Sequence, residues 1–190
     1  NENVLVITIG TVVGAGLMSD GGVLRGRSGG VGEIRHFPVE EDGPRCQCGG
    51  HGCLESLIGK SALVLRAREG GLIGADAGIG ALRTLAASGD TAAQQLFSQA
   101  GHLLGRVLAG VVNLVDPEIV IVLGEGVESW TPWSYGFEPA FRSALIPRNR
   151  AVPLALAPSP AARRAPGPPS PALRSEARRG RQERRSLSSP

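Results

Sequence analysis

The first 25 residues alternate apolar runs with glycine-containing turns. Residues 4–10 read VLVITIG, which is typical of a buried strand, and residues 14–20 and 23–25 are two further strand candidates. The sequence Asp20-Gly21-Gly22 supplies residues that tolerate positive φ, as a tight hairpin turn requires. The pattern therefore predicts an antiparallel meander at the start of the chain.

A helical pattern begins near Ser61 and becomes clearest in the middle of the chain. The first helix is expected to break at the glycines of residues 70–74, and a second covers residues 81–87. From Thr91 onward, apolar residues recur every three or four positions, which predicts a long amphipathic helix. Thr91 is the expected N-terminal cap, with Gln94 reaching back to it.

An apolar segment follows the point where Asp116-Pro117 ends this helix. Residues 119–123 read IVIVL and are apolar on both faces, as expected for a central strand covered by helices on each side. With the preceding helix, this strand predicts an α/β fold. No stretch approaches the roughly 18–20 apolar residues of a membrane span, so we expect a cytoplasmic protein that does not contact the membrane.

The composition changes after residue 152. Residues 153–190 hold eight of the fourteen prolines, eight arginines, two glutamates and no aromatic residue, without any periodic pattern. Such a segment buries too little apolar surface to offset its chain entropy. We therefore predict a folded domain over residues 1–152 and a disordered tail over residues 153–190. The tail is either a basic interaction segment or, given one lysine against nineteen arginines in the chain, the product of a shifted reading frame.

All three cysteines and two of the three histidines lie within residues 36–53. His36 is followed after nine residues by Cys46, and then by Cys48 and Cys53, with glycines that allow a tight curl. One imidazole and three thiolates make a closed tetrahedral set that suits a structural Zn²⁺ ion. We therefore predict a zinc site formed by these four residues, with backbone N–H groups near the sulfurs.

Two other interpretations of the cluster remain open. The cysteines could be ordinary buried thiols, and His51 could replace His36 as the fourth ligand, although it lies inside the tight curl. If the zinc site is real, removing the metal should unfold the loop of residues 32–55.

The same segment resembles a known family. Residues 32–56, GEIRHFPVEEDGPRCQCGGHGCLES, are similar to the signature of the ROK family (repressors, open reading frames and sugar kinases), which is G-E-x-G-H, nine residues, C-x-C-G-x-x-G-C-x-E. The resemblance covers residues 2 to about 152. It implies an α/β fold that is actin-like and ribonuclease-H-like, of which this chain holds mainly the C-terminal lobe.

The resemblance also implies a sugar site. In the family, the residues that correspond to Glu33, His36 and Glu55 hold sugar hydroxyls. A histidine bound to zinc through one ring nitrogen offers the other to a hydroxyl. The carboxylates of Glu33 and Glu55 would select among sugar epimers, because the wrong epimer leaves a buried acceptor without a hydroxyl partner. The alternative interpretation is that both glutamates are solvated surface acids. Arg35 replaces a family glycine and is expected to crowd the pocket or pair with Glu33.

Kinases of the family transfer the γ-phosphoryl group of ATP to a sugar hydroxyl, with an aspartate as general base. The resemblance places that aspartate upstream of residue 4. Because the chain starts at Asn1 and runs almost directly into a strand, we expect a preceding part of the protein to be lacking. No residue of this chain is therefore assigned a catalytic role.

The two glycine loops expected near a nucleotide are degenerate. Kinases show G-T-G-x-G after the first strand, whereas here Val12 stands where the backbone must approach a phosphate. The adenosine-side loop, usually three glycines, has Glu125 at its centre. The retained positions are Gly10, Thr11, Gly14, Gly124 and Gly126. Both changes lower the expectation of phosphoryl transfer.

Residues 124–147, which include Trp130, Trp133 and Phe137, resemble a segment of actinobacterial ROK transcriptional regulators. In those proteins a sugar-sensing body follows an N-terminal winged helix-turn-helix. The tryptophans are expected as core or subunit-interface anchors. The resemblance implies that a sugar shifts a homodimer between DNA-binding and released arrangements, with DNA bound only through an N-terminal domain that this chain lacks.

We therefore expect the sugar-sensing, effector-binding region of a ROK transcriptional regulator. The alternative is a truncated ROK-family sugar kinase, an ATP-dependent hexose kinase similar to glucokinase, for which ATP is the cofactor. A third interpretation is a degenerate gene fragment without function. The sequence upstream of Asn1 would separate the first two, since a helix-turn-helix favours the regulator.

Overall fold

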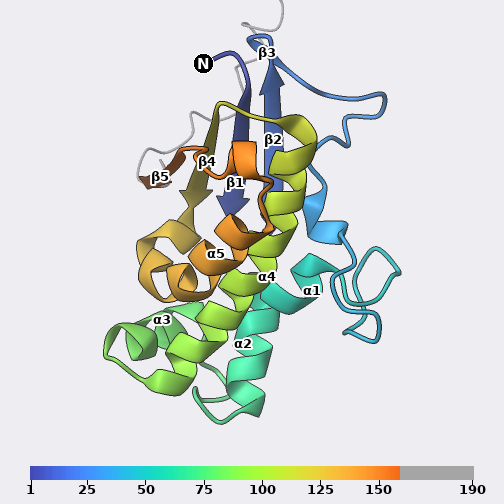
Figure 1. Cartoon of the computed structure of the whole chain (residues 1–190). Helices are drawn as coiled ribbons and strands as arrows, with labels where there is room; N and C mark the ends of the chain where they lie inside the picture. Colours follow the sequence, from blue (N-terminus) through green and yellow to red (C-terminus); the bar gives the residue numbers. More distant parts are fainter. Residues whose placement is uncertain (159–190) are drawn as a thin grey trace, which may run out of the picture. The chain divides into compact units, whose positions relative to one another are not determined.

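The computed structural model describes residues 1–158, which form an α/β fold built on one mixed sheet (Figure 1). Its strand order is β3-β2-β1-β4-β5. β1 pairs antiparallel with β2 and parallel with β4, which in turn pairs parallel with β5. The strands are β1 (Val4–Ile9), β2 (Val13–Ser19), β3 (Gly22–Val23), β4 (Ile119–Gly124) and β5 (Leu154–Pro158). The helices are α1 (Leu54–Ile58), α2 (Lys60–Glu69), α3 (Ile79–Ala87), α4 (Thr91–Val115) and α5 (Trp130–Ala144), with 3-10 turns η1 (Ile34–His36), η2 (Glu125–Ser129) and η3 (Pro147–Asn149).

The predicted meander is confirmed. Ser19 of β2 pairs with Gly22 of β3, and the two residues between them, Asp20 and Gly21, have φ values of 51° and 72°. A two-residue turn of this kind continues the right-handed twist of its strands. The third strand is shorter than expected, since it ends at Val23.

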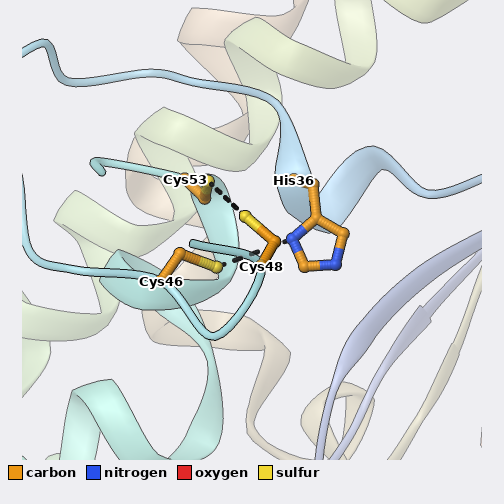
Figure 2. Close-up of side chains that lie close together, drawn as sticks. All are labelled: His36, Cys46, Cys48 and Cys53. Atoms are coloured by element: carbon orange, nitrogen blue, oxygen red, sulfur yellow. Dashed lines mark hydrogen bonds between the residues drawn. The ribbon is translucent and has the colours of Figure 1, made fainter. Parts of the chain in front are cut away.

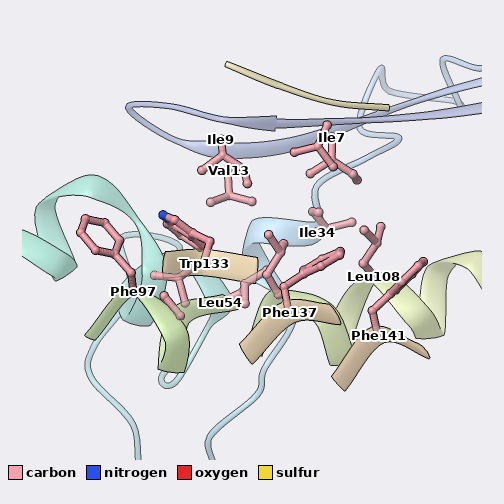
Figure 3. Packing of buried hydrophobic residues seen from close by; sticks show 14 of the residues in the cluster. Ile7, Ile9, Val13, Ile34, Leu54, Phe97, Leu108, Trp133, Phe137 and Phe141 are labelled. Atoms are coloured by element: carbon pink, nitrogen blue, oxygen red, sulfur yellow. The ribbon is translucent and has the colours of Figure 1, made fainter. Parts of the chain in front are cut away.

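The hydrophobic core lies between the sheet and the helices (Figure 3). Ile7 of β1 and its β4 partner Val122 are completely buried, whereas their neighbours Val6 and Ile121 are only half-buried. Because side chains alternate between the faces of a strand, helices bury one face of this strand pair. The expectation that β4 is covered on both faces is therefore not met within residues 1–158.

Helix α5 carries the two tryptophans that are predicted to be anchors, together with further aromatic side chains. Trp133, Phe137 and Phe141 are buried against α4 and the sheet (Figure 3). Trp130 lies at the edge of this group, with its ring centroid 4.9 Å from that of Phe137 in an edge-on arrangement. The prediction that the tryptophans are core or interface anchors is thus confirmed for Trp133, which is a core residue.

Helix α4 begins at Thr91, so its N-terminal cap lies one residue before the predicted cap. The Asp90 carboxylate accepts a hydrogen bond from the Ala93 N–H at 2.8 Å, so Asp90 and not Thr91 caps the helix. Gln94 donates from its side chain to the Ala86 carbonyl of α3 and does not reach back to a cap. Although α4 has 25 residues, no helix in the described part of the chain is long and apolar enough to cross a membrane.

Replacing Asp90 with alanine is expected to lower the free energy of unfolding by about 1 kcal/mol, because the Ala93 N–H loses its acceptor. The matched change Thr91→Ala should alter it by no more than a few tenths of a kcal/mol, since alanine is a good helix former. Urea denaturation of both variants measures the difference. Equal losses would show that Asp90 is not the cap.

The predicted boundary at residue 152 is wrong. Strand β5 begins at Leu154 and extends the sheet beside β4, with Leu154 paired to Val120 and Ala155 to Ile121. The folded part therefore continues at least six residues into the segment predicted to be a disordered tail. The rest of that segment, residues 159–190, lies outside the described residues.

Candidate metal and ligand site

The side chains of His36, Cys46, Cys48 and Cys53 meet in one cluster, as their spacing predicts (Figure 2). Their ligand atoms all lie within 4.8 Å of one another. His36 is the last residue of η1, and Cys53 directly precedes α1. The backbone must therefore curl between these two elements to bring the other sulfurs in.

Glycines allow the backbone to curl tightly enough to bring the cysteine sulfurs together. The Cys46 N–H donates to the Gly50 carbonyl at 2.8 Å, and the Gly49 N–H donates back to the Cys46 carbonyl at 3.0 Å. Gly49 has a φ of 94°, a conformation that favours glycine. An isolated bridge between Pro38 and Cys53 ties the end of the loop to the residues after η1.

His51 does not belong to the cluster. Its side chain is exposed, and its backbone pairs with Arg45 in an isolated bridge across the loop. The cluster contains His36 in its place. The alternative assignment based on His51 is therefore not supported by the geometry.

The imidazole of His36 has two different environments. Nδ1 lies 3.5 Å from the Cys46 sulfur, whereas Nε2 lies 3.8 Å from Oε2 of Glu33. Figure 2 shows the first nitrogen directed at the sulfurs and the second directed away from them. An ion bound among the sulfurs would take Nδ1 and leave Nε2 for another partner.

Cys48 and Cys53 differ in acidity. A hydrogen bond from the Gly50 backbone, with smaller contributions from the neighbouring thiols, lowers the pKa of the exposed Cys48. Burial, followed by interactions with Cys48 and Cys46, raises the pKa of Cys53 to about 12. Without a cation, the buried thiol therefore keeps its proton at neutral pH. A dication that replaces this proton is the natural complement of the cluster.

This donor set fits Zn²⁺. Three sulfurs and one imidazole nitrogen complete a tetrahedron and leave no position for water, so the ion would be structural. The Gly50 N–H beside Cys48 is the kind of backbone donor expected near a thiolate cluster of net charge −1. The interpretation of the three cysteines as ordinary buried thiols is therefore not supported.

A cavity of about 680 Å³ adjoins the cluster. Its lining includes His36 and Glu55, two of the three predicted sugar ligands, together with Thr11 and Val12 from the loop between β1 and β2. Glu33 does not line this cavity but lies beside Nε2 of His36. The structure thus places His36 and Glu55 at one cavity, and Glu33 lies beside His36 but outside the lining of that cavity.

Glu55 is held by a contact that the sequence does not reveal. Its Oε2 accepts a hydrogen bond from the Val13 backbone N–H at 2.8 Å, which ties α1 to the start of β2. Backbone donors carry no sequence signature, so Val13 could not be found by pattern. The bond fixes the carboxylate at the wall of the cavity, with Oε1 free of partners within residues 1–158.

Arg35 pairs with Glu33, one of the two outcomes expected of this residue. Its Nε lies 2.7 Å from Oε2 of Glu33, and both side chains are partly exposed. The Arg35 side chain also lines the cavity beside His36. The family's glycine is therefore replaced by a residue that competes with any ligand for the Glu33 carboxylate.

The two glycine loops lie at the same end of the sheet, because they follow the C-terminal ends of β1 and β4, which are parallel neighbours. Gly124 has a φ of 109°, and a side chain on Gly126 would overlap Ile9 at the end of β1. These two glycines allow the end of β4 and the start of η2 to approach Ile9 closely. Val12, 47% exposed, lines the cavity where the kinase pattern has glycine. The predicted loop residues are thus placed as Gly10, Thr11 and Gly14 on one side and Gly124 and Gly126 on the other.

A family model described as the ROK family matches residues 1–146 of the chain. The chain belongs to the ROK family. Its actin-like α/β fold and its His/Cys₃ cluster are consistent with the fold and zinc motif of ROK proteins. The predicted family and fold class are confirmed.

Regulators and kinases of the ROK family are both similar to this chain. The DNA-binding transcriptional dual regulator NagC of Escherichia coli is 33% identical over 135 residues, which cover 67% of this chain and 33% of NagC. An N-acetylmannosamine kinase of Shigella boydii is 38% identical over 122 residues, covering 64% and 41%. The chain therefore spans only about a third to two fifths of the length of these relatives.

Solved ROK structures divide in the same way. A ROK family transcriptional regulator, a homologue of the E. coli MLC protein, has a TM-score of 0.74 at 30% identity and covers 82% of this chain and 42% of its own. The ROK hexokinase of Thermus thermophilus has a TM-score of 0.72 at 31% identity, covering 82% and 51%. Similarity alone does not separate regulator from kinase.

Proposed function

We propose that the chain is the sugar-sensing part of a ROK transcriptional regulator, with a structural zinc ion held by His36, Cys46, Cys48 and Cys53. The observation that carries the proposal is the divided environment of the His36 ring, with Nδ1 on the sulfurs and Nε2 away from them. Zinc would fix the ring, and Nε2 would meet a sugar hydroxyl. Glu55, held by Val13, would accept a second hydroxyl, and Glu33 a third.

The sugar class follows from the relatives. One is named an N-acetylglucosamine repressor, one an N-acetylmannosamine kinase and one, from Thermotoga maritima, a glucokinase. A hexose or N-acetylhexosamine is therefore the proposed effector. The predicted homodimer, the cytoplasmic location, DNA binding through a further domain and the likeness of residues 124–147 to actinobacterial regulators belong to the same proposal.

Two side chains favour the regulator over the kinase. Val12 presents a branched side chain at the cavity where a phosphate would need close backbone approach. Glu125 adds a negative charge beside Gly124, on the side expected for the adenosine. Phosphoryl transfer by an ATP-dependent hexose kinase remains the second candidate, because kinase relatives match at similar identity.

Calorimetry on the zinc-loaded chain of residues 1–190 tests the proposal. We expect glucose, N-acetylglucosamine or N-acetylmannosamine to bind, and His36→Ala and Glu55→Gln to abolish that binding. His51→Ala is the matched control and should bind as the wild type does. Binding of Mg·ATP at millimolar or better affinity would contradict the proposal that the chain is part of a regulator.

Replacing Arg35 with glycine restores the family residue and is expected to raise sugar affinity by about 3- to 10-fold, because Glu33 loses its 2.7 Å partner. Calorimetry with the sugar that binds the wild type measures the gain, and zinc content verifies the fold of the loop. An unchanged or weaker affinity would show that Glu33 does not contact the sugar.

A further inference from the structure

The thiols of Cys48 and Cys53 face each other in the cluster, with their sulfurs 3.6 Å apart (Figure 2). A disulfide bond is about 2.0 Å long, so the two sulfurs would have to approach by about 1.5 Å to be joined. Three of the four residues between them are glycines. Gly49 and Gly52 have φ values of 94° and 58°, so this backbone can adjust where other residues would resist.

The two thiols differ in their access to solvent. Cys48 is exposed and lines the 680 Å³ cavity, whereas Cys53 is only 3% exposed. Gly50 lies against both sulfurs, since a Cβ on it would be 3.6 Å from the Cys48 sulfur and 3.7 Å from the Cys53 sulfur. The glycine therefore leaves the pair without a covering side chain on that side. A small solute from solvent can reach Cys48, with Cys53 standing behind it as a second thiol.

We propose that Cys48 and Cys53 form a disulfide when the protein meets a hydroperoxide, and that this oxidation releases the zinc ion and ends sugar binding. The inference rests on the proposed zinc and sugar sites and adds a means of regulating them. An exposed cysteine with a second thiol within reach is the arrangement of redox-sensing proteins. Zinc and the disulfide require the same two sulfurs, so each excludes the other.

The chemistry consists of two displacements. The Cys48 sulfur attacks one oxygen of hydrogen peroxide, so that an S–O bond forms, the O–O bond breaks and hydroxide leaves. The Cys53 sulfur then attacks the Cys48 sulfur, so that the S–S bond forms and the S–O bond breaks. The two thiolates lose two electrons, and these electrons, with two protons from solvent, reduce the peroxide to two water molecules. Zinc keeps only His36 and Cys46, which is half of a closed tetrahedral set.

Loss of zinc acts on two of the proposed sugar ligands. The His36 ring, whose Nδ1 lies 3.5 Å from the Cys46 sulfur, loses the ion that would fix its orientation. Cys53 directly precedes α1, which carries Glu55. A shift of Cys53 toward Cys48 is therefore passed to the carboxylate at the wall of the cavity.

The test treats the zinc-loaded chain of residues 1–190 with hydrogen peroxide. A chromophoric chelator measures the zinc released, intact mass measures the hydrogen atoms lost, and calorimetry measures sugar affinity. Iodoacetamide then labels the remaining thiols. The tryptic peptide of residues 46–60 carries all three cysteines, so fragmentation of this peptide identifies the labelled one.

We expect one zinc ion released and two hydrogen atoms lost per chain, with the label on Cys46 alone. Sugar affinity should fall at least about tenfold, the usual scale for disturbing the residues around a metal site. Dithiothreitol followed by zinc should restore the thiols, the metal and the affinity.

Two variants form a matched pair, because Cys46→Ser and Cys48→Ser each remove one sulfur and one zinc ligand. Cys46→Ser keeps the proposed pair and should lose two hydrogen atoms per chain. Cys48→Ser should do so at least about tenfold more slowly, because its remaining sulfurs are the two buried ones. Equal rates for the two variants would overturn the assignment of the pair.

Three outcomes with the wild-type chain would also overturn the inference. They are zinc retained with all thiols free, a label on Cys48 or Cys53, and oxygen added to Cys48 without a disulfide. Zinc release that leaves sugar affinity unchanged would overturn the regulatory part. An untreated chain that binds no sugar would contradict the proposed function, whereas zinc release and the position of the label would still decide the oxidation.

Discussion

Replacing Cys53 with serine is expected to abolish stoichiometric zinc binding and to lower the free energy of unfolding by more than about 4 kcal/mol, as loss of a structural metal does. Cys53 is 3% exposed and joins the loop to α1, so an unligated polar group there would be buried. Zinc content by mass spectrometry and urea denaturation measure the two effects. Amide hydrogen exchange should show that protection is lost first between residues 36 and 53.

His51→Ala is the matched control for this change, because it alters the same loop at an exposed residue outside the cluster. It should keep one zinc per chain and the wild-type stability. Because burial keeps the Cys53 thiol protonated in the metal-free protein, zinc uptake displaces a proton, and the apparent zinc affinity should fall as the pH is lowered. A Cys53→Ser chain that retains one tightly bound zinc would refute the ligand set.

The second large effect is expected at Gly136, where α5 crosses α4. A Cβ at this position would overlap the Ser98 carbonyl oxygen of α4, and the neighbouring aromatic core leaves little room for the helices to separate. Gly136→Ala should therefore cost about 3 kcal/mol of unfolding free energy, the upper part of the usual range for overpacking. Chemical denaturation measures the loss.

Gly110→Ala is the control, since it makes the same substitution inside α4. Gly110 is exposed, and a Cβ there meets no atom within 4 Å. This variant should gain about 0.5 to 1 kcal/mol, because alanine is the better helix former. If both changes were to shift stability in the same direction, close contact between α4 and α5 at Gly136 would be ruled out.

The cluster was predictable from sequence because its information is local and chemical. Three cysteines and a histidine within eighteen residues have few uses besides a metal, and the glycines between them allow the curl that the structure contains. The hairpin at Asp20 and Gly21 was predictable for the same reason, since positive φ is demanded by the turn itself.

Strand β5 was missed because nothing local specifies it. Its five residues, LALAP, lie between prolines in a segment of biased composition, and they become a strand by pairing with β4, more than thirty residues earlier. The cap of α4 was misplaced by one residue because Asp90 and Thr91 are both good caps, and only the Ala93 N–H distinguishes them.

The proposed function requires that the His36 ring bind a metal at Nδ1 and stay open to a ligand at Nε2. X-ray absorption spectroscopy at the zinc edge of the purified chain tests it most directly. We predict three sulfur ligands at about 2.3 Å and one nitrogen at about 2.0 Å, with the nitrogen lost in His36→Ala and kept in His51→Ala. A sulfur-only shell, or a nitrogen that survives His36→Ala, would contradict the proposed coordination by His36.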